Sequence, residues 1–125
     1  MSMAIAHFAF GGAVTVLVVT YLVPGVRYPR LVSLAGGVWA MLPDVHWVSP
    51  VFASGLKAIH GSPLVDVFFL HHTLDALDGG DSKLVAAAFV GLLVVATALA
   101  ERREYRTLER IRTLSGPGRD DHRGQ

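Results

Sequence analysis

The chain has 125 residues, of which 52% are apolar and 17% charged; its formal net charge is +1 and its mean hydropathy is +0.47. This length accommodates one domain, and the apolar excess is typical of an integral membrane protein, so we expect the lipid bilayer as a partner. Cysteine is absent, which excludes disulfides, thiolate metal ligands and cysteine nucleophiles. The small net charge and the interspersed acids argue against a nucleic-acid partner.

The first apolar run, residues 4–23, is nearly uncharged and has about the ~20 residues that a membrane-spanning helix needs. Gly11 and Gly12 give this run a patch of small residues where another helix can approach closely. Its one polar residue with useful chemistry is His7. Pro24-Gly25 predicts the end of this helix.

The second apolar run, residues 31–42, is too short to cross a bilayer perpendicular to its plane. Gly36-Gly37 predicts tight packing on a neighbouring helix. The run ends at Pro43-Asp44-Val45-His46, and proline disfavours helical geometry in the residue before it, so an acid and an imidazole lie at a helix end. Residues 48–63 are typical of an interfacial loop with a short helix, and we interpret His60 in this loop as a surface residue without a role.

Residues 64–78 combine imidazoles and carboxylates with apolar side chains. Read as one helix, they place His71 and Asp75 one turn apart on one face, with His72 beside them. An unpaired charge in apolar surroundings is costly, so the polar groups need a partner. A bound metal ion, a mutual hydrogen-bond network and a water-filled cavity are the three alternatives.

The last apolar run, residues 84–100, carries no charge and is the clearest membrane span in the chain. Arginines cluster directly after it, so we expect the helix to continue into the aqueous phase on the cytoplasmic side. The sequence thus predicts a membrane helical domain over residues 1–114 and a disordered polar tail over residues 115–125.

These runs predict an all-α fold, a small polytopic membrane bundle of about four hydrophobic helices, two of them short. If the helices run up and down and both termini are cytoplasmic, three segments bring His7, Asp44 and His71 to similar depth near the cytoplasmic face. Asp75 is then expected deeper in the membrane. The two arginines of the turn at residues 27–30 would face outward, against the usual preference.

Three motifs resemble those of the membrane-bound metal-dependent hydrolase family that includes the LexA-binding inner-membrane proteins. They are Ala6-His7-Phe8, residues 37–46 with Pro43-Asp44-Val45-His46 at their end, and residues 71–76. The resemblance covers roughly the first 80 residues. The departures from the family pattern are His46 at an aspartate position, His72 at an arginine position and Ala76 at a histidine position.

The resemblance implies a divalent-metal-dependent hydrolase of the inner, or plasma, membrane, with zinc as the expected ion. A pocket opening at the membrane surface favours a lipid-like or phosphoester substrate. The expected metal ligands are His7, Asp44 and His71. The expected further ligands, orienting partners or general base are His46, His72 and Asp75.

Two other functions are compatible with the same residues. The first is a non-catalytic membrane scaffold that binds a membrane-protein partner and uses its histidines and aspartates as an internal hydrogen-bond network. The second is haem ligation by two histidines.

Overall fold

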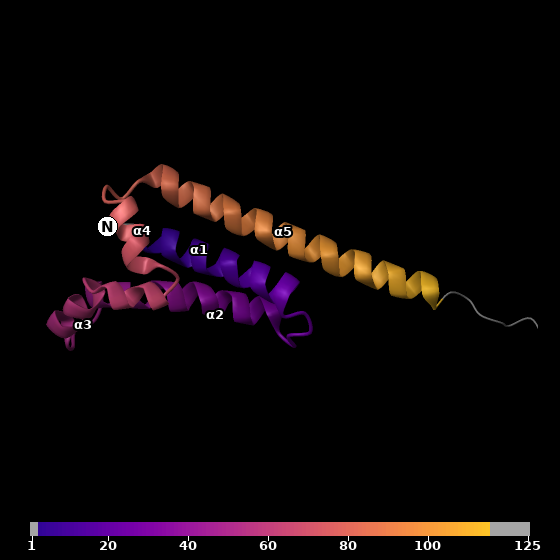
Figure 1. Ribbon diagram of the computed structural model, residues 1–125, viewed down its shortest axis with the longest axis horizontal. Helices are drawn as coiled ribbons and strands as arrows, with labels where there is room; N and C mark the ends of the chain where they lie inside the picture. Colours follow the sequence, from indigo (N-terminus) through magenta and orange to yellow (C-terminus); the bar gives the residue numbers. More distant parts are fainter. Residues whose placement is uncertain (1–2, 116–125) are drawn as a thin grey trace, which may run out of the picture.

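Three long helical rods lie along roughly one axis in the computed structural model, which describes residues 3–115 (Figure 1). They are α1 (Ala4–Leu17), extended by a π-helical turn η1 (Val18–Leu22), α2 (Pro29–Met41) and α5 (Lys83–Leu114). α1 packs against both of the others. α2 runs back antiparallel to α1, and α5 then runs parallel to it. Every element described is helical, which confirms the all-α prediction.

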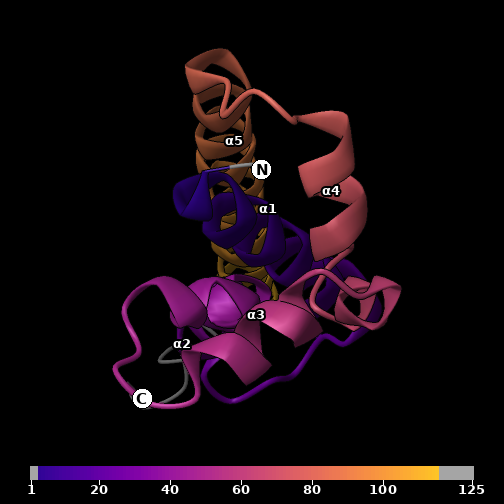
Figure 2. The same ribbon diagram turned by 90° about the vertical axis from the view of Figure 1, so that its left-hand side faces the viewer.

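The chain between α2 and α5 folds at the end of the bundle where α1 begins (Figure 2). It forms the short elements η2 (Leu42–Trp47), α3 (Ala53–His60), η3 (Pro63–Val67) and α4 (His71–Leu77). α3 packs on η2, and α4 packs on η3. The start of α1 and the short elements η2, α3 and α4, each of which carries a histidine, therefore meet at one end of the molecule.

Glycines allow α1 and α2 to approach closely. A Cβ built on Gly37 would lie 2.9 Å from the carbonyl oxygen of Phe8, and one built on Gly11 would lie 2.8 Å from the carbonyl oxygen of Gly36. Real Cβ atoms do not approach backbone oxygens this closely, and a backbone cannot rotate away as a side chain can. This confirms the tight packing that the sequence predicted for each glycine patch, and it shows that the two patches pack on each other.

Two helices are long and apolar enough to cross a membrane, by length and composition: Ala4–Leu22 and Lys83–Leu114. The apolar stretch of α5 has little protein around it, and Val94, for example, is 62% exposed. α2 has 13 residues and α4 has 7, so neither reaches the length of a span. The described residues thus contain two candidate spans, whereas the sequence predicted about four hydrophobic helices, two of them short.

Residues 64–78 do not form the single helix that the sequence predicted. η3 (Pro63–Val67) ends first, and Phe69 and Leu70 then adopt positive φ angles of 54° and 58° before α4 (His71–Leu77) begins. Non-glycine residues rarely adopt this conformation, because it strains the backbone. The break turns the chain, so that α4 starts a new direction at the polar end of the bundle.

Asp66 caps α4 after this break. Its carboxylate accepts a hydrogen bond from the backbone N–H of Thr73 at 2.8 Å and one from the Thr73 hydroxyl at 2.7 Å. These bonds hold the pKa of Asp66 below its ordinary value. The predicted spacing of His71 and Asp75 is retained, because both lie within α4.

The arginine-rich end of α5 lies at the end of the bundle away from α3 and α4 (Figure 1). Arg103 donates a hydrogen bond to the Thr20 carbonyl oxygen at 2.6 Å, and Arg30 pairs with Glu101 at 3.4 Å. The start of α1 and the end of α5 are therefore at opposite ends, whereas the sequence-based topology placed both termini on one side. The broken segment before α4 explains the difference, because it does not cross the bundle as a fourth rod. Of the predicted tail, residues 116–125 lie outside the described residues.

We expect Gly37→Ala to destabilise the protein by about 1–3 kcal/mol, because the added methyl group on α2 overpacks the contact with Phe8 of α1, including its backbone carbonyl. Thermal unfolding in detergent measures this change. Gly91→Ala is the matched control, since a Cβ on this exposed α5 residue meets nothing within 4 Å. Equal stability of the two variants would contradict the close approach of α1 and α2.

Candidate metal centre

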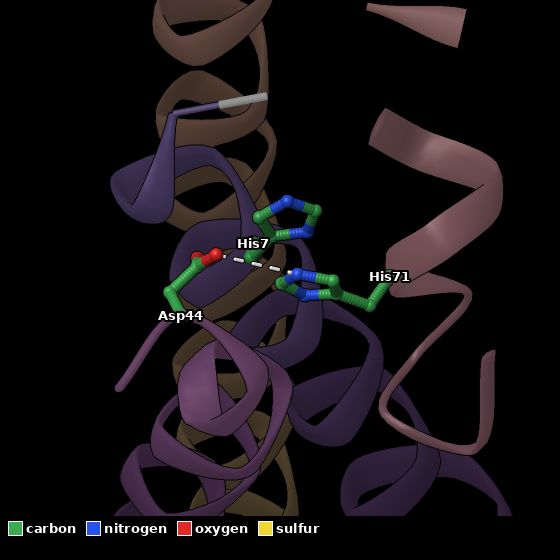
Figure 3. A group of neighbouring side chains, drawn as sticks. All are labelled: His7, Asp44 and His71. Carbon is green, nitrogen blue, oxygen red and sulfur yellow. Dashed lines mark ion pairs between the residues drawn. The ribbon is translucent and has the colours of Figure 1, made fainter. Parts of the chain in front are cut away.

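Three side chains from separate elements point at one another where α1 begins and α2 ends (Figure 3). His7 lies in the first turns of α1, Asp44 lies in η2 just after α2, and His71 is the first residue of α4. The two histidines are 1% and 0% exposed, and one ligand atom from each of the three residues lies within 4.8 Å of the others. The structure thus brings together the three residues that the sequence predicted as metal ligands.

The backbone fixes the tautomer of His71. Its Nδ1 lies 3.0 Å from the carbonyl oxygen of Ala40. Because a carbonyl only accepts hydrogen bonds, Nδ1 carries the proton, and the Nε2 of the neutral ring carries a lone pair. An Nδ1–H donated to a backbone carbonyl is the usual support of a histidine that binds metal through Nε2.

The His71 Nε2 atom faces the Asp44 carboxylate, with 3.4 Å between Nε2 and Oδ1. Nε2 is buried and has no hydrogen-bond partner. A lone pair and a carboxylate repel each other unless a positive charge lies between them, so this gap requires either a proton or a cation. Burial alone lowers the pKa of His71, but the Asp44 carboxylate and the Ala40 carbonyl outweigh burial and raise it.

Asp75 joins the same cluster, although the sequence placed it deeper in the membrane. Its Oδ1 lies 3.1 Å from His7 Nε2, and its Oδ2 lies 3.2 Å from His60 Nε2. The difference follows from the backbone turn before α4, which brings this short helix alongside the start of α1. Asp75 thus links two histidines that are far apart in the sequence.

His60 is a site residue that the sequence analysis missed. We interpreted it as a surface residue, but it is only 9% exposed. Its Nδ1 lies 3.8 Å from Asp44 Oδ1, and it forms a second group of metal-ligand type with His71 and Asp75. His60 is the last residue of α3, and a histidine before a glycine in a predicted loop gives no pattern from which burial can be inferred.

The other two predicted site residues lie further from this cluster. His46 is buried, its Nδ1 donates to the Pro43 carbonyl oxygen at 2.9 Å, and its ring lies 4.6 Å from that of His60. His72 is partly exposed and belongs to neither donor group among the described residues. His46 therefore borders the cluster, while His72 does not enter it.

The cluster consists of residues that commonly bind metal ions, and several of its buried nitrogen and oxygen atoms have no hydrogen-bond partner. Within residues 3–115, four buried side-chain atoms lack a hydrogen-bond partner: His7 Nδ1, Asp44 Oδ2, His60 Nδ1 and His71 Nε2. Leaving such atoms unpaired costs about 1–3 kcal/mol each, and imidazole nitrogens with carboxylate oxygens are ligands that zinc accepts. The arrangement can hold a divalent metal ion.

Comparisons with known proteins add no assignment, because no family model, curated protein or solved structure matches this chain.

Proposed function

We propose that this protein is a membrane-bound hydrolase that uses one divalent ion, zinc, held by His7, Asp44 and His71. The observation that carries the proposal is the His71 Nε2 lone pair facing the Asp44 carboxylate at 3.4 Å without a donor between them. One proton could fill that gap, but it would leave the buried His7 Nδ1 and Asp44 Oδ2 atoms unpaired. A cation bound by several ligands can pair with more of these buried atoms than one proton can.

The number of ligands and their exposure favour a catalytic site over a structural one. Catalytic zinc sites have three protein ligands and keep one position open, whereas structural sites are closed by four. The Asp44 and Asp75 side chains are 10% and 13% exposed, so the cluster reaches the surface and water has access to it. A divalent ion in such a site lowers the pKa of a water ligand towards ~7 and polarises the scissile bond.

Asp75 is the residue that we assign as general base. Its two oxygens contact His7 and His60 at 3.1 and 3.2 Å, which fixes the carboxylate beside the donor group formed by His7, Asp44 and His71. A carboxylate held in this way can accept the proton of an attacking water. His60 orients this carboxylate through the contact between its Nε2 and Asp75 Oδ2.

The charge distribution supports placement in the inner, or plasma, membrane with the end of α5 in the cytoplasm. Arg30 lies at the same end of the bundle as Arg103, so the turn after α1 no longer opposes the preference for cytoplasmic arginine. The metal centre then lies at the opposite face, not at the cytoplasmic face that the sequence suggested. Its position at a membrane surface favours a lipid-like or phosphoester substrate.

A structural role is the second candidate, and a specific observation favours it. Asp75 already pairs directly with His7 and His60, and the rings of His7 and His71 stack with centroids 3.8 Å apart. These contacts join α1, α3 and α4 without a metal ion. A scaffold held together in this way would bind a membrane-protein partner and contain no stoichiometric metal.

Metal content tests the proposed site directly. We expect about one zinc ion per chain in detergent-purified protein supplied with zinc, because one three-ligand site is formed. Elemental mass spectrometry should show that His71→Ala and Asp44→Asn each lose the ion. Asp81→Asn, which removes an exposed carboxylate outside the cluster, should retain it. A folded wild-type protein without metal, or retention of metal in both site variants, would favour the structural role.

Asp75→Asn tests the assigned base. The variant keeps the size of the side chain but cannot accept a proton, so we expect hydrolysis of a chromogenic phosphoester or ester to fall about 10²–10⁴-fold in kcat. Zinc content should be retained, because the three assigned ligands are unchanged. Wild-type turnover by the zinc-loaded variant would remove Asp75 from the mechanism.

A further inference from the structure

An apolar groove of about 570 Å³ runs between α1, α2 and α5, from Phe8 near the start of α1 to the arginine-rich part of α5. It is lined along its length by Gly12, Val16, Leu34, Leu93 and Ala100. The small side chains on α1 leave this space open where the neighbouring helices diverge. A groove with such a lining suits a hydrocarbon chain.

A second hollow, of about 520 Å³, lies next to the groove at the arginine-rich end of α5. Its lining includes Tyr21, Arg102, Arg103, Arg106 and Arg110. Arg103 and Thr107 line both spaces, so the hollow and the groove adjoin. Glu101 and Glu104 contribute to the groove, but among the described residues no acid lines the hollow.

Arg103 is fixed at the junction of the two spaces. Its guanidinium donates a hydrogen bond to the Thr20 carbonyl oxygen at 2.6 Å. This bond satisfies a backbone acceptor near the end of the first candidate span. Its guanidinium also lies over the Tyr21 ring, 4.8 Å from the centroid. The remaining N–H groups of a guanidinium held in this way can bind a phosphate oxygen at little additional entropic cost.

We propose that the groove and the hollow together bind one anionic phospholipid, with an acyl chain in the groove and the phosphate headgroup among the arginines. Charge complementarity selects this occupant, because four arginines of α5 line the hollow and each adds to the attraction of an anionic lipid. The position also fits, since the hollow lies where α5 passes from its apolar stretch to its charged stretch. This site is separate from the metal centre, which lies at the other end of α1.

Native mass spectrometry of the full chain in detergent tests this inference with dioleoyl phosphatidylglycerol and dioleoyl phosphatidylcholine as probes. We expect one phosphatidylglycerol per chain, bound about tenfold or more in preference to phosphatidylcholine. Arg106→Gln with Arg110→Gln should reduce this binding by about tenfold or more, because two headgroup contacts are lost. Arg27→Gln with Arg112→Gln is the control, since it removes the same charge from residues that line neither space.

Three results would overturn the proposal. Equal binding of the two lipids would show that the arginines do not select the headgroup. An equal loss in the control pair would show a general effect of net charge. Displacement of the lipid by an equal concentration of inorganic phosphate would show that the groove contributes nothing and that the hollow binds free phosphate. Zinc content of the Arg106/Arg110 variant should equal that of the wild type, which separates this test from that of the metal centre.

Discussion

The structure depends on one electrostatic constraint: carboxylates and imidazoles are buried together in a bundle that is otherwise apolar. Asp44 and His71 face each other with acceptor atoms 3.4 Å apart, and the Ala40 carbonyl prevents the His71 ring from resolving the conflict by changing tautomer. Burial makes such a conflict costly. A divalent ion would balance the negative charge of the carboxylates and satisfy several lone pairs at once, and this is the physical basis of the metal site that we propose.

Helix packing creates the conditions for the site. The close approach of α1 and α2 at Gly11 and Gly37 sets His7 against the chain that leaves α2, where Asp44 lies. The helices α1, α2 and α5 run up, down and up (Figure 1). As a result, the histidine and aspartate cluster lies at one end of the bundle and the arginine-rich part of α5 lies at the other. The proposed metal site and the proposed lipid site therefore lie at opposite ends of one short chain.

The sequence predicts the parts of this arrangement that follow from local patterns. The apolar runs, the paired glycines and the spacing of His71 and Asp75 indicate an all-α bundle and bring the three ligand-type residues together. The break at Phe69 and Leu70 could not be predicted, because no glycine or proline marks it and tertiary packing overrides local propensity. The burial of His60 depends on that same long-range packing, so periodicity gives no indication of it.

Zinc K-edge absorption spectroscopy of the zinc-loaded protein tests the central claim most directly. The account predicts a centre with only nitrogen and oxygen ligands, in which two imidazoles bind at about 2.0–2.1 Å and their scattering is reduced in His71→Ala. A spectrum without imidazole scattering, or one unchanged in His71→Ala, would contradict the account. The gap between His71 and Asp44 would then be filled by a proton, and the cluster would hold the helices together without a metal ion.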